Sequence, residues 1–250
     1  MMDADRIARE REFHNLRFSD DSERETRVAR FYCAIRYGFD LYEERVAVES
    51  RRRRVLEYGC GTGSLAFDLT EGAGEVIGID ISEVAIEGAR REAERRGLEN
   101  TRFLVDNAES MQLPDRYVDV VAGSGIVHHL DIPKAMAEVR RVLKRGGVAL
   151  FAEPLAHNPA LRWYRRRTPE LRSPDEHPLT TADLSAIARG FASAKVTYFG
   201  LVAPMLGLVS AAPKSDSFAT RLTWWLDRAL CSVPGLNRYA WYCLIELKNG

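Results

Sequence analysis

Apolar runs and amphipathic segments alternate through the middle of the chain. The apolar runs predict strands at residues 54–59, 75–81, 101–107 and 147–154, and one within 117–130 that leads into a loop. Helical periodicity predicts helices at 63–72, 82–97 and 132–147. The second of these helices starts at the N-cap Ser82 and stops at Gly97. Strands and helices that alternate through short loops form a parallel sheet with both faces covered, so the pattern predicts an α/β fold.

The flanking segments follow other patterns. Residues 3–18 are polar and weakly periodic, whereas 22–46 place apolar side chains at helical spacings, so we predict a helical N-terminal cap over 1–50. Beyond Pro154 the pattern predicts a long connection, a helix, a strand, a helix and a closing strand, at 155–179, 180–191, 193–202, 215–233 and 237–249. We therefore expect one domain over 51–250, with cover insertions at about 155–180 and 200–238.

Composition and charge exclude several classes of protein. The hydrophobic fraction of 46% is that of a globular chain with a core. Basic and acidic residues both number 36, which gives no support for a nucleic-acid partner, and we expect none. The four cysteines lack CxxC spacing, so we expect no metal site and a reducing, cytoplasmic location. The charged N-terminus lacks a signal peptide's apolar region, and the apolar stretch at 199–212 is shorter than the ~20 residues that span a membrane.

A glycine loop carries the densest chemical signal. After the first predicted strand, Gly59, Gly61 and Gly63 stand at every second position. Such glycines allow positive φ angles and close approach of a ligand to the backbone. A loop of this kind before a helix offers free N–H groups to phosphates or carboxylates.

Neighbouring residues narrow the choice of ligand. The dinucleotide fingerprint G-x-G-x-x-G does not fit, because the third glycine comes one residue early and position 64 is serine, and no lysine follows as in a phosphate-binding P-loop. The second strand ends at Asp80, 21 positions after Gly59, where a carboxylate can accept hydrogen bonds from both ribose hydroxyls. Asp106 and Asn107 follow the third strand at the same edge of the sheet, where an amide could bond an adenine.

Five blocks in this order resemble the class I S-adenosylmethionine-dependent methyltransferases, most closely the small-molecule group similar to the ubiquinone and menaquinone methyltransferases. The blocks are "VLEYGCGTGSL", "VIGIDISEVAIEGAR", "FLVDNAESMQLP", "YVDVVAGSGIVHHL" and "EVRRVLKRGGVALFAEP". They cover about residues 54–154, less than half of the chain. The resemblance implies a Rossmann-like, seven-stranded, mostly parallel sheet with helices on both faces and an antiparallel last strand, which agrees with strands near 195–199 and 241–247.

The resemblance also implies where S-adenosylmethionine would bind. The three glycines would lie against its methionine part, Asp80 would hold the ribose, and Ile81 would pack on the adenine. Where the family has an acid before alanine, this chain has Asn107 before Ala108, with Asp106 one place earlier; the alignment favours Asn107 as the contact of the adenine amine. The full set of predicted cofactor residues is Glu57, Tyr58, Gly59, Cys60, Gly61, Gly63, Asp80, Ile81, Asp106, Asn107, Ala108, Ser124 and Gly125.

Methyl transfer from a sulfonium is a one-step displacement, so the enzyme mainly aligns the reactants and needs a base only if the acceptor keeps its proton. The candidate bases are His128, His129, Glu153 and His157, each with a structural role as the alternative. The charged residues Arg165 to Arg167, or Glu176 and His177, are candidates for orienting a polar acceptor group.

Aromatic residues outside the five blocks have two interpretations each. Trp224 and Trp225 lie on a predicted helix, where the alternatives are core packing and a lid or membrane or partner contact. One of Tyr32, Tyr37 and Tyr42 could close over the cofactor, because aromatic rings attract a sulfonium cation.

We therefore predict an enzyme that transfers a methyl group from S-adenosylmethionine to an O, N or C nucleophile of a small, apolar or amphipathic molecule such as a quinone, lipid or secondary metabolite. The alternatives are other chemistry with the same cofactor, such as cyclopropanation, and a non-catalytic binding role. The sequence does not specify the acceptor or the oligomeric state.

Overall fold

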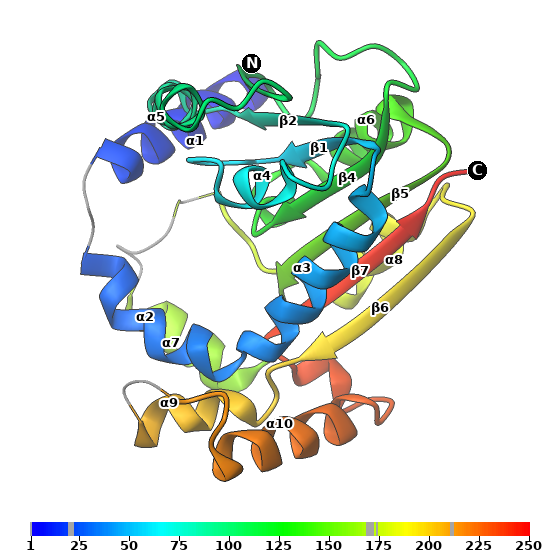
Figure 1. The fold of residues 1–250 in the computed structure, drawn as a ribbon. Coiled ribbons are helices and arrows are strands. Elements are labelled where there is room, and N and C mark those ends of the chain that lie inside the picture. Colours follow the sequence, from blue (N-terminus) through cyan, green and yellow to red (C-terminus); the bar gives the residue numbers. More distant parts are fainter. Residues whose placement is uncertain (1, 20–22, 169–172, 174, 211–212) are drawn as a thin grey trace.

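Seven strands form one sheet in the order β3-β2-β1-β4-β5-β7-β6 in the computed structural model, which describes residues 2–19, 23–168, 173, 175–210 and 213–250 (Figure 1). The strands are β1 Arg54–Tyr58, β2 Glu75–Asp80, β3 Thr101–Val105, β4 Val118–Ser124, β5 Leu143–Pro154, β6 Ser193–Phe199 and β7 Tyr242–Lys248. Strands β1 to β5 pair in parallel, and β7 runs antiparallel between β5 and β6. The predicted Rossmann-like sheet with an antiparallel last strand is confirmed.

Helices cover both faces of this sheet, because its strands are apolar on both sides. Alternate residues of β1 show this: Val55 packs in the hydrophobic cluster on one face, and Leu56 and Tyr58 pack in the cluster on the other. The covering helices that connect strands are α4 Ser64–Leu69, α5 Glu83–Arg96, α6 Ile132–Val142 and α8 Thr181–Ala188.

The predicted limits of α5 are confirmed. The Ser82 hydroxyl accepts a hydrogen bond from the Ala85 N–H, and Gly97 ends the helix with a φ of 65°. The predicted end of α6 is wrong: the helix stops at Val142, since Leu143 already pairs with Val118 across the sheet and begins β5.

The described residues of the N-terminal segment form the helices α1 Met2–Ser19, α2 Glu23–Ala34 and α3 Arg36–Ser50. The run predicted at 22–46 is therefore broken, at Ile35, whose backbone leaves the helical region with a ψ of 13°. Figure 1 shows α3 lying along one face of the sheet and α1 near the ends of the strands beside α5. This arrangement brings side chains of α1 and α3 to the edge where the strands end.

The connection after β5 also contains a helix that its polar sequence concealed. Helix α7 covers Pro159–Arg167, and its N-cap Asn158 accepts hydrogen bonds from the N–H groups of Ala160 and Leu161. Between β6 and β7 the chain forms the 3-10 turn η3 Ala203–Met205, α9 Leu206–Val209 and α10 Phe218–Cys231, which gather at the lower end of the molecule in Figure 1. The described part of the chain has no helix with both the length and the apolar character that a membrane span requires.

Asp227 fastens α10 to the rest of the fold. Its fully buried carboxylate accepts hydrogen bonds from the N–H groups of Gly200 at 2.8 Å and Ala203 at 2.8 Å, and the Tyr37 hydroxyl of α3 also donates to it. One side chain therefore joins α10, α3 and the loop after β6.

We predict that Asp227→Ala lowers the free energy of unfolding by about 3 kcal/mol or more, because several buried donors would lose their acceptor. Urea denaturation of the variant measures this loss. The control is Asp216→Ala, since Asp216 lies exposed just before the same helix. Equal unfolding midpoints for the two variants would show that Asp227 is not a structural fastening.

Candidate functional site

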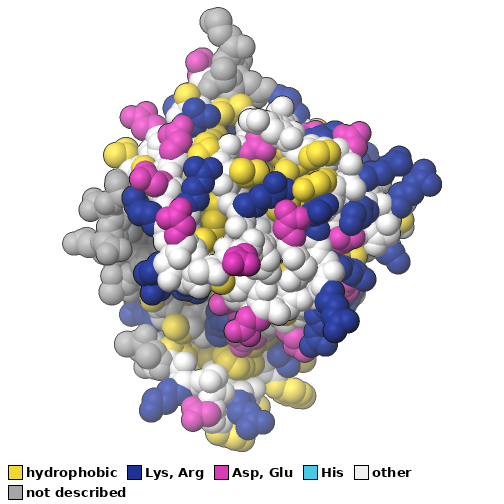
Figure 2. Space-filling model, turned by 45° about the horizontal axis from the view of Figure 1, so that its top comes forward, with side chains coloured by type: hydrophobic (Ala, Val, Ile, Leu, Met, Phe, Trp, Pro, Cys, Tyr) yellow, Lys and Arg dark blue, Asp and Glu magenta, His cyan; other side chains and the backbone are white. Residues whose placement is uncertain are grey.

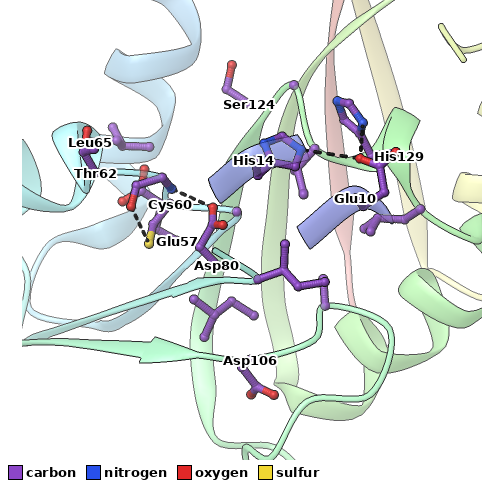
Figure 3. A pocket seen from close by; sticks show the side chains of 18 of the residues that line it. Glu10, His14, Glu57, Cys60, Thr62, Leu65, Asp80, Asp106, Ser124 and His129 are labelled. Carbon is purple, nitrogen blue, oxygen red and sulfur yellow. Dashed lines mark hydrogen bonds and ion pairs between the residues drawn. The ribbon is translucent and has the colours of Figure 1, made fainter. Parts of the chain in front are cut away.

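A cavity of about 390 Å³ lies where β1 to β4 end, with walls from the N-terminal helices (Figure 3). From the strand ends and the loops after them it is lined by Glu57, Gly59, Cys60, Gly61, Thr62, Ser64, Leu65, Ile79, Asp80, Ile81, Asp106, Asn107, Ala108, Glu109, Ser124, Gly125, Ile126, His129 and Leu130. Helices α1 and α3 add Arg6, Ile7, Glu10, His14, Arg17, Phe18, Phe39, Tyr42 and Glu43. The volume is that of a site for a small molecule or cofactor.

The glycine loop after β1 forms one wall of this cavity. Gly59 and Gly61 have φ angles of 72° and 50°, which residues with a side chain rarely adopt. A Cβ on Gly59 would lie 2.7 Å from the Ile126 side chain. At Gly59 and Gly61 the loop therefore presents backbone without a side chain to the cavity.

The Asp80 carboxylate holds the glycine loop against the end of β2. One oxygen accepts a hydrogen bond from the Gly61 N–H at 2.8 Å, and the other accepts from the Ser82 N–H at 2.9 Å. Figure 3 shows Asp80 facing the loop that carries Cys60 and Thr62. Because a carboxylate can accept about four hydrogen bonds, Asp80 still has capacity for hydroxyl groups of a ligand.

Glu57 places a second carboxyl group in the wall, and its ionisation is disfavoured. Burial raises the pKa of Glu57 to about 8, although the Ala66 N–H donates to it at 2.9 Å. A cation bound in the cavity would favour the ionised carboxylate.

After β3, Asp106 and Asn107 both line the cavity. The Asp106 carboxylate accepts hydrogen bonds from the N–H groups of Asn107 at 2.8 Å and Gln112 at 2.9 Å. The Asn107 side-chain oxygen accepts one from the Glu109 N–H at 2.9 Å. Either side chain can meet a ligand here, and the preference for Asn107 stays a prediction.

A histidine and a glutamate face each other on the opposite wall. His129 follows β4 in the 3-10 turn η1 Val127–His129, and its Nδ1 lies 3.1 Å from a Glu10 carboxylate oxygen of α1. Figure 3 shows Glu10 between His129 and His14. Burial acts to raise the pKa of Glu10, but hydrogen bonds from His129, His14 and Ser173 outweigh it, so the pKa lies well below its ordinary value. Glu10 is therefore an ionised carboxylate that can orient the His129 ring.

His128 and Glu153 form a separate buried pair behind the cavity lining. The Glu153 carboxylate accepts from the N–H groups of Ile126 at 3.0 Å and Val127 at 2.8 Å, and lies 2.8 Å from His128 Nδ1. Burial lowers the pKa of His128 and raises that of Glu153 to about 7. Both side chains hold the turn that presents His129.

The structure brings most of the predicted site residues to the one cavity. Of the predicted cofactor residues, Tyr58 and Gly63 are outside the lining. The Tyr58 hydroxyl donates to the Ala108 carbonyl at 2.6 Å, and Gly63 packs so closely on Phe103 that a Cβ would lie 2.8 Å from its ring. Of the candidate bases only His129 lines the cavity, whereas His157 accepts a hydrogen bond from the Thr181 N–H at 3.2 Å.

Sequence reasoning missed the contribution of α1. Arg6, Glu10 and His14 lie on one helical face, at spacings of four residues, and that spacing was the available signal. Arg6 anchors the helix, because it donates to the His129 carbonyl at 2.9 Å and pairs with Glu109.

Tyr42 is the predicted aromatic candidate that reaches the cavity. Its ring is buried, and within the described part of the chain its hydroxyl has no hydrogen-bond partner. The other two tyrosines lie elsewhere: Tyr37 donates to Asp227, and the Tyr32 hydroxyl lies 3.2 Å from that of Tyr242.

The charged loop after β5 approaches the same wall from behind. Arg165 pairs with Glu176, whose carboxylate lies 3.9 Å from His129 Nε2. Neither side chain lines the cavity, and their predicted role toward an acceptor stays a prediction.

Side chains of the types that bind metal ions also lie close together here, although the sequence predicted no metal site. Ligand atoms of Glu10, His14 and His129 lie within 4.8 Å of one another, as do those of His128, His129 and Glu176. The 3.1 Å contact between Glu10 and His129 is a hydrogen bond that needs no ion.

Comparison with known proteins places the chain in a protein family. A family model described as a methyltransferase domain matches residues 49–176, which is half of the chain. The chain is 36% identical over 123 residues to an uncharacterized methyltransferase, YcgJ, of Bacillus subtilis, covering 48% of this chain and 49% of that protein. It is 39% identical over 124 residues to the demethylmenaquinone methyltransferase of Thermus thermophilus, covering 47% and 56%. The chain thus spans about half the length of these curated relatives.

A solved structure shares the fold over most of the chain. Geranyl diphosphate C-methyltransferase from Streptomyces coelicolor, solved with Mg²⁺, geranyl diphosphate and S-adenosyl-L-homocysteine, matches with a TM-score of 0.63 over 85% of this chain and 79% of that chain, at 15% identity. The family match and the sheet order together identify this protein as a member of the methyltransferase domain family with the fold of the class I S-adenosylmethionine-dependent methyltransferases.

Proposed function

We propose that this protein binds S-adenosylmethionine in the cavity and transfers its methyl group to a nucleophilic O, N or C atom of a small molecule. The observation that carries the proposal is the convergence of the family's cofactor motifs, around Gly59, Asp80 and Asn107, on one cavity that His129 also lines. When bound, S-adenosylmethionine supplies an electrophilic methyl group on a sulfonium.

The residues present fit this cofactor. Glu57 and Asp80 line the cavity with further carboxyl groups, which suits a ligand that carries a sulfonium and an ammonium group. The bare glycine loop suits close approach of the methionine part, and Asp80 can accept from ribose hydroxyls. The buried Tyr42 hydroxyl supplies a polar atom that a ligand would satisfy.

The chain's own part in the reaction is to align the acceptor, exclude water and remove a proton. His129 is the proposed general base: the acceptor's proton moves to the imidazole, and Glu10 holds the ring. The Glu153 and His128 pair acts indirectly, by fixing the turn that carries His129.

The acceptor class rests on the composition of the cavity walls and on the relatives. Ile7, Phe18 and Phe39 of the N-terminal helices give the cavity apolar walls beside the polar His129. Such walls support an apolar or amphipathic acceptor, consistent with relatives named for demethylmenaquinone and geranyl diphosphate.

The raised pKa of Glu57 predicts that protons are released when the cofactor binds. Its folded pKa of about 8 lies above the ordinary value of 4.5, so its stabilising contribution is present below pH 4.5 and is lost as the pH rises through about 8. We predict that cofactor binding at pH 7 releases close to one proton, because the cationic ligand favours ionised Glu57. Calorimetry in buffers of different ionisation enthalpy measures this release, which should vanish in Glu57→Gln; equal release by both proteins would contradict the assignment.

The experiment that tests the function uses S-adenosylmethionine with a deuterated methyl group and a panel of quinols, isoprenoid diphosphates, phenols and aromatic acids. Methyl transfer adds the labelled group to one acceptor and yields S-adenosylhomocysteine, both visible by mass spectrometry. A product that retains fewer deuterium atoms than the methyl group carries would point to cyclopropanation. Cofactor binding without any modified acceptor would favour a binding role.

A further inference from the structure

Helix α10 exposes an apolar stripe on the side that faces away from the protein. Phe218, Leu222 and Trp225 follow one another at spacings of four and three residues, so they share a helical face, and they are 81%, 44% and 65% exposed. Met205 and Leu208, in the adjoining segment before α10, are 63% and 67% exposed. We call these five residues the α10 face. Several large exposed apolar side chains in one segment are typical of an interaction site.

The opposite side of α10 fixes this orientation. Thr220, Asp227 and Cys231 are buried, and the Trp224 indole N–H donates to the Ala34 carbonyl at 2.7 Å. No described residue of α10 lines the cavity. The helix therefore cannot act as a lid over the site without breaking the Asp227 contacts, and its apolar face is held toward solvent.

The segment that contains the α10 face has more basic than acidic residues. The segment 200–241 carries Lys214, Arg221, Arg228 and Arg238, and its only acids are Asp216 and the buried Asp227. The whole chain is balanced, with 36 basic and 36 acidic residues, whereas this segment has four basic and two acidic residues and so a net positive charge. Figure 2 shows hydrophobic and basic side chains, with acidic ones among them, at the lower end of the molecule, where Figure 1 places α9 and α10.

This combination selects one kind of partner. An amphipathic helix with Trp and Phe on its apolar side and Lys and Arg beside them is the arrangement that lies in the interface of an anionic membrane. A symmetric contact with a second copy would instead bring the same basic groups together. We propose that the α10 face docks on a lipid bilayer that contains anionic lipids, with Phe218, Leu222 and Trp225 in the interface and Lys214 and Arg221 on the headgroups.

Co-sedimentation with vesicles tests the proposal independently of methyl transfer. The probes are vesicles of phosphatidylcholine alone and of phosphatidylcholine mixed with phosphatidylglycerol. We expect the protein to bind the mixed vesicles more strongly, with binding that weakens as salt is added and a blue shift of tryptophan fluorescence.

Two variants separate the apolar and electrostatic contributions. Phe218→Ser with Trp225→Ser should weaken binding at least about tenfold. Lys214→Gln with Arg221→Gln should weaken binding to the mixed vesicles about 25-fold, because each basic residue near an anionic surface contributes about fivefold. The matched control is Arg91→Gln with Arg95→Gln, which removes two exposed charges on α5, at the other end of the molecule, and should leave binding unchanged.

Three results would overturn the proposal. The first is a wild-type protein that does not sediment with the mixed vesicles. The second is equal binding by the wild type and both α10 variants. The third is a dimer in sedimentation velocity that disappears in the Phe218 and Trp225 variant, since the α10 face would then be covered by a second copy.

Discussion

Asp80→Ala is expected to weaken the binding of S-adenosylmethionine at least about 100-fold. The variant removes the acceptor proposed for two ribose hydroxyls, and hydrogen bonds to a charged group are worth about 1.5–3 kcal/mol each. It also frees the Gly61 N–H, which Asp80 now holds at 2.8 Å, so the glycine loop loses its fixed position. Isothermal titration calorimetry measures the affinity.

Two further variants make this result interpretable. Asp115→Ala removes a carboxylate that is 75% exposed outside the cavity and should bind the cofactor like the wild type. Asp80→Asn preserves the shape of the side chain and should lose about tenfold in affinity even if the alanine variant is unstable. If Asp80→Ala bound the cofactor with wild-type affinity and had an unchanged unfolding midpoint, Asp80 would not be a cofactor-binding residue.

His129→Ala is expected to lower kcat by about 10² to 10⁴ for an acceptor that must lose a proton, which is the usual contribution of a general base. Cofactor affinity should change little, because His129 follows β4 and Asp80 ends β2, with β1 between these two strands. Single-turnover kinetics with the acceptor found in the screen measure the chemical step apart from binding.

The matched control is His157→Ala. His157 comes shortly after β5 but lies outside the cavity, where it accepts a hydrogen bond from Thr181, so its loss should leave kcat unchanged. Glu10→Gln should lower kcat less than His129→Ala, because the imidazole stays in place but loses the carboxylate that orients it. If His129→Ala turned over at the wild-type rate, His129 would not be the general base, and this wall would serve only to align the acceptor.

The central sheet could be predicted from the sequence because its signals are local. Ser82 and Gly97 cap α5 through their own backbone and side-chain chemistry, and the apolar runs of the strands reflect burial on both faces. The break at Ile35 was not predicted, because helical spacing of apolar residues continues through it. Helix α7 was not predicted, because its sequence is polar and ends in a run of arginines.

The sequence predicted the part of the cavity that the strand ends form, but not the part that α1 forms. The residues after β1 to β4 belong to motifs, but the wall from α1 depends on tertiary packing that places a polar helix over the strand ends. Glu10 is a buried polar residue whose side chain is hydrogen-bonded, so a search for hydrophobic periodicity does not identify it as buried. Likewise, only the geometry of the turn η1 decides that His129 faces the cavity while the adjacent His128 pairs with Glu153.

Calorimetric titration of the intact protein with S-adenosylmethionine, S-adenosylhomocysteine and NAD tests the central claim most directly. We predict that both adenosyl sulfur compounds bind with one-to-one stoichiometry and that NAD does not, because the cavity has the glycine and acid pattern of the methyltransferase family. Binding of NAD, or no binding of either sulfur compound, would contradict the proposed function.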